Sequence, residues 1–188
     1  MNHSRKLTAA LTAVLAAASA PALADNRSSF AANLTGYQET PLTLNSPASG
    51  EFAASVSNDG SAIHYTLTYR GFTSDVAQAH IHFGRPAITG MIVLFLCNTS
   101  GSPPATVPTP PACPARSGTV SGTLTAANVI ARAQQGVDGG AQGFAEIVRA
   151  LRNGAVYANV HTATFPGGEI RAALGPAQDR GDENDDND

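Results

Sequence analysis

Two histidines separated by a single residue, His80 and His82, have the type and spacing for metal or acid–base chemistry. Successive side chains of a β-strand point to opposite faces, so both imidazoles would share one face, roughly 7 Å apart along the backbone. Ile81 and Phe83 would point to the other face, towards the core. With a third histidine on a neighbouring strand, this pattern supplies the imidazole ligands that suit copper and zinc.

A second set of polar side chains is predicted near the end of the chain, on two strands at 155–162 and 168–174. If Val160 faces Ile170, the apolar residues of both strands match on one face, whereas a slip by one residue would set them against polar groups. This register also sets His161 opposite Glu169 and Asn159 opposite Arg171. We call the residues on this other face the polar cluster: Tyr157, Asn159, His161, Glu169 and Arg171.

Three hypotheses account for these side chains. In the first, the two strand histidines and the polar cluster form a hydrogen-bonded network that fixes the sheet and shapes a binding surface. In the second, His80, His82 and His161 bind copper or zinc. Glu169 would then be a fourth ligand or would orient His161. In the third, His161 and Glu169 are the acid–base pair of a hydrolase, although the sequence has no G-x-S-x-G motif and no obvious nucleophile.

The rest of the pattern predicts the elements that position these residues. Residues 142–153 are predicted as an amphipathic helix, because apolar residues recur at helical spacing from Phe144 to Leu151 and Asn153-Gly154 is a typical stop. Thr125 is predicted to cap a short helix at 126–133. We expect an all-β fold, an antiparallel Greek-key-like β-sandwich or barrel with the helix at about 142–153 packed on it. Further strands are predicted at 29–40, 50–57, 61–70, through His80 and His82, at 91–96 and at 117–124.

The first 24 residues have the three parts of a secretory signal peptide. A short basic region is followed by an apolar stretch and by Ala22-Leu23-Ala24, a typical cleavage pattern. We therefore expect a secreted or periplasmic protein with no membrane span after cleavage. In an exported chain, Cys97 and Cys113 are expected to form a disulfide bond.

Charge divides the remainder into a domain at 25–176 and a tail at 177–188. The domain is close to neutral, whereas the tail is strongly acidic and is predicted to be a disordered, solubilising end. A neutral body with an acidic tail argues against nucleic-acid binding. A weak calcium site is the alternative interpretation of the tail.

Several motifs, in their order along the chain, resemble the CHRD domain family. They are A-H-I-H, an apolar strand, a helix that ends in L-R-N-G, then Y-A-N-V-H-T and P-G-G-E-I-R, between about Phe30 and Leu174. The turn after the histidines departs from the family's usual G-P-A, because it reads Gly84-Arg85-Pro86-Ala87, and Ala172-Ala173 stands where the family often has G-Q.

The resemblance implies an all-β extracellular domain without enzyme activity. We therefore expect an exported, non-enzymatic binding or structural module with an unidentified extracytoplasmic partner or ligand. The alternative is a copper- or zinc-binding protein. Its H-x-H strand would be similar to that of copper/zinc superoxide dismutases, although the additional histidines and the bridging aspartate of those enzymes are missing here.

Overall fold

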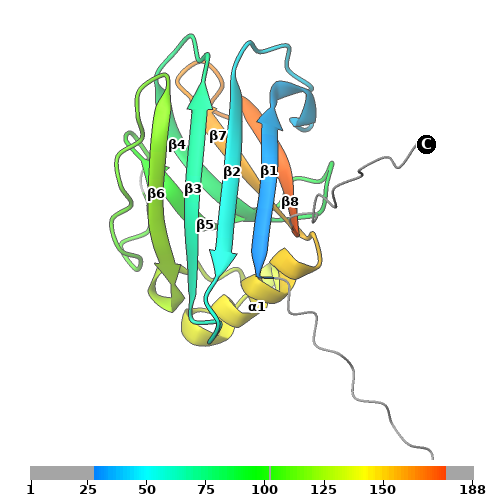
Figure 1. Ribbon diagram of the computed structural model, residues 1–188, viewed down its shortest axis with the longest axis vertical. Coiled ribbons are helices and arrows are strands. Elements are labelled where there is room, and N and C mark those ends of the chain that lie inside the picture. Colours follow the sequence, from blue (N-terminus) through cyan, green and yellow to red (C-terminus); the bar gives the residue numbers. More distant parts are fainter. Residues whose placement is uncertain (1–27, 102, 177–188) are drawn as a thin grey trace, which may run out of the picture.

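The chain forms one antiparallel β-sheet that curls into a nearly closed barrel (Figure 1). The computed structural model describes residues 28–101 and 103–176, and in these ranges it has eight strands and one α-helix. The strand order is β5-β4-β7-β8-β1-β2-β3-β6. The expectation of an all-β fold with one helix is thereby confirmed. The strands are β1 (Ser29–Thr35), β2 (Ser49–Val56), β3 (Ala62–Arg70), β4 (Val76–Phe83), β5 (Met91–Asn98), β6 (Gly118–Thr125), β7 (Val156–Thr162) and β8 (Ile170–Pro176).

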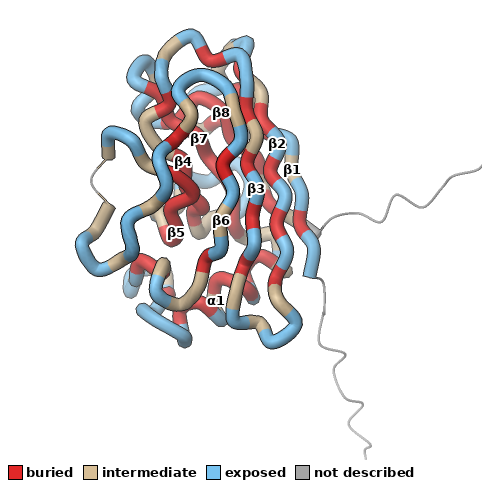
Figure 2. Tube along the Cα trace, turned by 60° about the vertical axis from the view of Figure 1, so that its left-hand side comes forward, coloured by how far each residue is buried: buried red, intermediate tan, exposed pale blue. Residues whose placement is uncertain are grey.

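The two halves of the sheet differ in burial. Strands β2 and β3 alternate between buried and exposed or half-buried residues, as expected for a sheet with one face in the core and one in water. Strand β7 is buried along its whole length, and β4 is buried from Ala79 to His82 (Figure 2). The outer face of the barrel at β4 and β7 is therefore covered, although polar residues lie on it.

The pairing of β7 with its neighbours brings the two sets of polar residues together. The predicted register of β7 and β8 is confirmed, with Val160 opposite Ile170 and Asn159 opposite Arg171. On its other side β7 pairs with β4, where His80 lies opposite Asn159. The H-x-H strand therefore lies directly beside the strand that carries most of the polar cluster.

The helix α1 (Gly140–Arg152) lies at one end of the barrel (Figure 1). The apolar stripe that begins at Phe144 and ends at Leu151 is buried, as its spacing predicts. Asn153 follows the last turn, and Gly154 has φ of 63°, a left-handed conformation that favours glycine. The helix predicted at 142–153 is thus confirmed.

Two sequence predictions of local structure are wrong. The strand predicted at 29–40 ends at Thr35, because the chain turns sharply there in η1, a short 3-10 helix (Gly36–Gln38). A side chain at Gly36 would overlap the carbonyl group of Leu44, which packs back onto this turn. The turn begins the long β1–β2 loop that later covers the polar cluster.

The short helix predicted at 126–133 is replaced by two 3-10 turns, η2 (Ala126–Asn128) and η3 (Ala133–Gln135). Thr125 does meet Asn128 as a cap, since its backbone N–H donates to the Asn128 side chain. The segment then leaves the helical path because Ile130 donates its N–H to the carbonyl of Val93. Ile130 and the side chain of Arg132 thereby bond to the edge of β5 that is not paired with β4.

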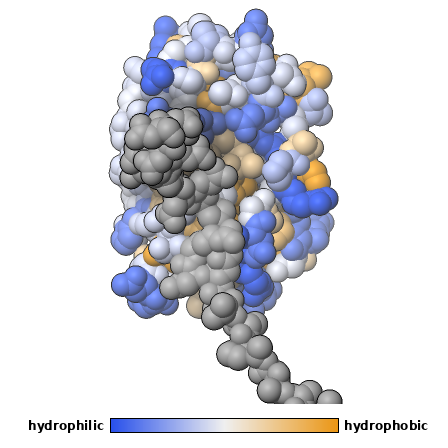
Figure 3. All heavy atoms as spheres, turned by 45° about the vertical axis from the view of Figure 1, so that its right-hand side comes forward, coloured by the Kyte–Doolittle hydropathy of each residue, from blue (hydrophilic) through white to orange (hydrophobic). Residues whose placement is uncertain are grey.

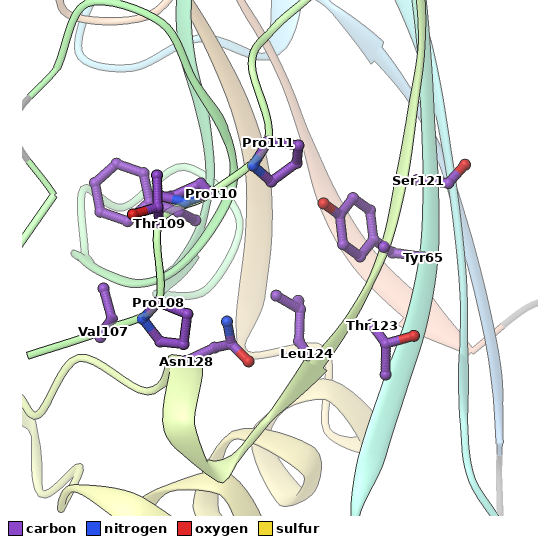
Figure 4. A pocket seen from close by; sticks show the side chains of 12 residues that line it. Tyr65, Val107, Pro108, Thr109, Pro110, Pro111, Ser121, Thr123, Leu124 and Asn128 are labelled. Atoms are coloured by element: carbon purple, nitrogen blue, oxygen red, sulfur yellow. The ribbon is translucent and has the colours of Figure 1, made fainter.

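The predicted disulfide bond between Cys97 and Cys113 is present and anchors the proline-rich loop that follows β5. A cavity of about 430 Å³ lies between this loop and β6. Figure 4 shows Tyr65 pointing from β3 towards the loop across this cavity. Phe95 on β5 also lines the cavity, and its ring contacts His80 on β4.

Figure 3 shows one face, on which hydrophobic residues form small patches among hydrophilic ones. None of the helices in the described ranges is long and apolar enough to cross a membrane. The signal peptide expected at 1–24 and the acidic tail expected at 177–188 lie outside the described residues.

Candidate functional site

Three histidines converge on the outer face of the barrel. His80 and His82 come from β4 and His161 comes from β7, and one donor nitrogen of each lies within 4.8 Å of those of the other two. The ring centroids of His80 and His161 are 4.9 Å apart, and those of His80 and His82 are 5.6 Å apart. All three side chains are buried, with His80 fully so.

The hydrogen bonds of His82 and His161 determine where their protons lie. The Nδ1 atom of His82 is 3.0 Å from the carbonyl oxygen of Gly90, and that of His161 is 3.0 Å from the carbonyl oxygen of Pro166. A carbonyl oxygen only accepts hydrogen bonds, so each Nδ1 must carry the proton. In the neutral imidazole, each Nε2 then presents a lone pair.

Four buried ring nitrogens have no hydrogen-bond partner among the described residues. They are Nε2 of His82, Nε2 of His161 and both ring nitrogens of His80. Buried polar atoms are nearly always paired, and leaving one unpaired costs about 1–3 kcal/mol. Four such atoms in one group therefore need an explanation that protein hydrogen bonds do not supply.

Burial also keeps these histidines neutral. Loss of hydration, with a smaller contribution from the neighbouring His161 and His82, lowers the pKa of His80 to about 2. Burial lowers the pKa of His82 to about 4, partly offset by its hydrogen bond to Gly90. The pKa of His161 is lowered for the same main reason. Neutral imidazole is the form that binds metal ions, so at neutral pH no proton competes for these nitrogens.

Aromatic rings pack against two of the three histidines. The ring of Phe95 packs edge-on against His80, with 4.5 Å between centroids, and Tyr157 stacks on His82 at 4.6 Å. Arg171 lies on Tyr157, with its Cζ atom 3.5 Å from the ring centroid. The Gly90 N–H donates to the Tyr157 hydroxyl, so one glycine holds both members of the His82–Tyr157 stack.

Glu169 directly precedes β8, and its carboxylate is hydrogen-bonded to residues other than the histidines. Its two oxygens accept hydrogen bonds from the hydroxyl groups of Ser46, at 2.7 Å, and Thr162, at 2.6 Å. Among the described residues, no side-chain hydrogen bond joins it to His161, and it is not in the group of three donors. The structure thus brings Glu169 into the covered face without bringing it to the histidine nitrogens.

The remaining members of the polar cluster bind the loops that cover this face. Asn159 donates to Glu39 at 2.5 Å. Arg171 donates to the hydroxyl group of Thr40 and to the carbonyl oxygen of Ile88, the latter at 2.7 Å. The β1–β2 and β4–β5 loops are therefore tied to the sheet beside the histidines.

Glu39 is a buried carboxyl group that the sequence does not reveal. Burial raises its pKa to about 7, although Asn159 and Arg171 act in the opposite direction. It lines a cavity of about 230 Å³ between the β1–β2 loop and the β7–β8 turn. In the sequence it stands in a polar loop segment, where no periodic pattern distinguishes it from a solvated carboxylate.

The comparison with protein families agrees with the motifs. The model of the family described as the CHRD domain matches residues 30–174. No curated protein and no solved structure matches the chain significantly. The matched residues include every strand that carries a histidine of the group.

Proposed function

This chain belongs to the CHRD domain family, and we propose that it is an exported domain that binds one ion of copper or zinc through His80, His82 and His161. The observation that carries the proposal is the set of four unpartnered, buried ring nitrogens in one group. A bound metal ion would satisfy three of them and would offset the cost of burying them.

The distances fit this proposal after small side-chain movements. Metal–imidazole bonds of about 2.0–2.1 Å place the ligand nitrogens roughly 3.5 Å apart. The donor nitrogens of the three histidines lie within 4.8 Å of one another. The distances between these nitrogens must therefore shorten by about an ångström, which requires modest rotations of the histidine rings on β4 and β7.

The surroundings of His82 and His161 also support a metal site. Histidine ligands usually donate their second N–H to a carbonyl or carboxylate group, which fixes the ring and its tautomer. The carbonyl oxygens of Gly90 and Pro166 provide this support. Glu169 has no part in the proposed ligand set, because both of its oxygens accept hydrogen bonds from hydroxyl groups.

The other two hypotheses find less support in the geometry. A structural network would be expected to use the histidine nitrogens for hydrogen bonds, yet four of them have no such partner in the described ranges. An acid–base pair would need contact between His161 and Glu169, whose carboxylate is bonded to Ser46 and Thr162 instead. Export is supported by the signal-peptide pattern and by the disulfide bond, which is typical of oxidising compartments.

Metal content tests the proposal. The untagged chain is incubated with copper or zinc, freed of excess ion and analysed by mass spectrometry. We expect close to one ion per chain, and a loss of that ion in His82→Ala and His161→Ala. His64→Ala is the matched control, because His64 is an exposed histidine on β3 outside the group.

Two results would contradict the proposal. One is a wild-type chain that retains no copper or zinc. The other is a retained ion that survives in both histidine variants, because the ion would then be bound elsewhere. In either case the polar cluster would be assigned to the structural network, and partners would be sought among exported proteins.

A further inference from the structure

The three donors of the proposed site carry no charge of their own. Each is a neutral imidazole, and the carboxylates on the same face accept hydrogen bonds from Ser46, Thr162 and Asn159. Because none of the three ligands is an anion, an ion held by the histidines would keep its full charge in a buried place. The cost of burying an ion rises with the square of its charge, so a divalent ion is disfavoured about fourfold more than a monovalent one in this continuum picture.

Nearby cations act in the same direction. The guanidinium group of Arg171 lies on one face of Tyr157, whose ring stacks on His82. Arg171 hydrogen-bonds to neutral oxygens, the Thr40 hydroxyl and the carbonyls of Arg85 and Ile88. Its charge, with that of Arg132, opposes positive charge at His82. Glu39 offsets less of this positive charge than a solvated carboxylate would, because burial raises its pKa to about 7.

The walls of the site favour a small number of ligands. Phe95 packs edge-on against His80, and Tyr157 covers the face of His82. The unpartnered nitrogens of all three histidines are shielded from solvent. Zinc takes four ligands and fills the fourth position of a three-histidine site with water. Monovalent copper is stable with three ligands, and imidazole is a suitable donor for copper.

We propose that the histidine site binds copper as the monovalent ion, with His80, His82 and His161 as its three ligands. This inference rests on the proposed function, since it names the ion and oxidation state that the same site selects. The apolar walls would also shield the bound ion from water and oxidants in the oxidising compartment to which the disulfide bond points.

Competition titrations test this choice of ion. The untagged chain is titrated without oxygen with Cu(I) against bicinchoninate, and separately with Cu(II) and Zn(II) against chelators of known affinity. We expect Cu(I) to bind at least tenfold more tightly than Cu(II) in the same buffer. Each factor of ten raises the potential of the bound copper couple by about 59 mV over that of the free ions, which voltammetry measures independently.

The outcomes separate this inference from the proposed function. The metal site and the choice of monovalent copper are both supported if Cu(I) binds more tightly than Cu(II) and Zn(II). This binding should be lost in His82→Ala and kept in His64→Ala. If Cu(II) or Zn(II) binds as tightly as Cu(I) or more tightly at the same histidines, the choice of monovalent copper is overturned and the metal site stands. If none of the three ions binds at the histidines, both proposals fall.

Discussion

Replacing His80 with leucine separates a metal ligand from a structural histidine. The ring of His80 is fully buried, and neither ring nitrogen has a hydrogen-bond partner among the described residues. An unsatisfied buried polar group costs about 1–3 kcal/mol, and leucine fills a similar volume without polar atoms. The edge-on contact with Phe95, of the kind that contributes about 0.5–1.5 kcal/mol, would be lost. We therefore expect His80→Leu to raise the free energy of unfolding of the metal-free protein by about 1–2 kcal/mol.

Urea unfolding in the presence of a chelator measures this change. For a typical m-value, the expected gain moves the midpoint upwards by roughly 0.5–1 M. His64→Leu is the control, because His64 is exposed and bonds to Thr123, and it should change stability by less than about 0.5 kcal/mol. With copper at about a hundredfold excess over its dissociation constant, the wild type should gain about 2.7 kcal/mol and His80→Leu nothing.

One result would refute this reasoning. If His80→Leu lowers the stability of the metal-free protein by more than about 1 kcal/mol, the histidine stabilises the apoprotein. Its nitrogens would then have partners in solution, and the hydrogen-bonded network would be the better explanation of the covered face. The substitution therefore distinguishes the two hypotheses without any assumption about which metal binds.

Three further perturbations have defined outcomes. Acidification from pH 6 to pH 5 should destabilise the metal-free protein by about 1–2 kcal/mol, measured by urea unfolding. His80 and His82, with pKa values of about 2 and about 4 in the folded protein, take up protons in this range only on unfolding. Glu39, whose pKa is raised to about 7, releases a proton on unfolding and so offsets the proton uptake of one histidine. A pH-independent midpoint would contradict the burial of neutral histidines. Gly90→Ala should lower the free energy of unfolding by more than about 2 kcal/mol and weaken metal binding. A Cβ atom at this position would overlap the backbone of β4 and displace the carbonyl group that orients His82. A metal affinity equal to that of the wild type in calorimetry would show that this carbonyl group is dispensable. Reduction of the Cys97–Cys113 bond should lower the free energy of unfolding by about 3 kcal/mol in chemical unfolding and leave the three histidines in place. Loss of the metal on reduction would contradict the expectation that the disulfide bond and the histidine site are independent.

Part of this site could be predicted because strand geometry constrains it. The alternation of β7 and β8 allows one register that matches apolar residues, and that register sets His161 and Arg171 on the polar face. The H-x-H spacing places His80 and His82 together for the same reason. What the sequence does not contain is the pairing of β4 with β7, since these strands are separated by more than seventy residues and two other strands.

The covering loops could not be predicted, because they have no periodic pattern. Glu39 and Ser46 lie in the β1–β2 loop, where only tertiary contacts decide that both become partners of the buried face. The role expected for Glu169 depended on its position opposite His161, yet nearby hydroxyl groups take both of its oxygens. The helix predicted after Thr125 is wrong for a related reason, since Ile130 donates its N–H to Val93 on the open edge of β5.

A crystal structure of the copper-loaded chain, with anomalous diffraction at the copper edge, tests the central claim most directly. We predict a single strong peak between β4 and β7, about 2 Å from Nε2 of His82, Nε2 of His161 and one ring nitrogen of His80. Nδ1 of His82 and His161 should keep their hydrogen bonds to the carbonyl groups of Gly90 and Pro166. A peak at any other place, or three histidines with no copper between them at saturating metal, would contradict it.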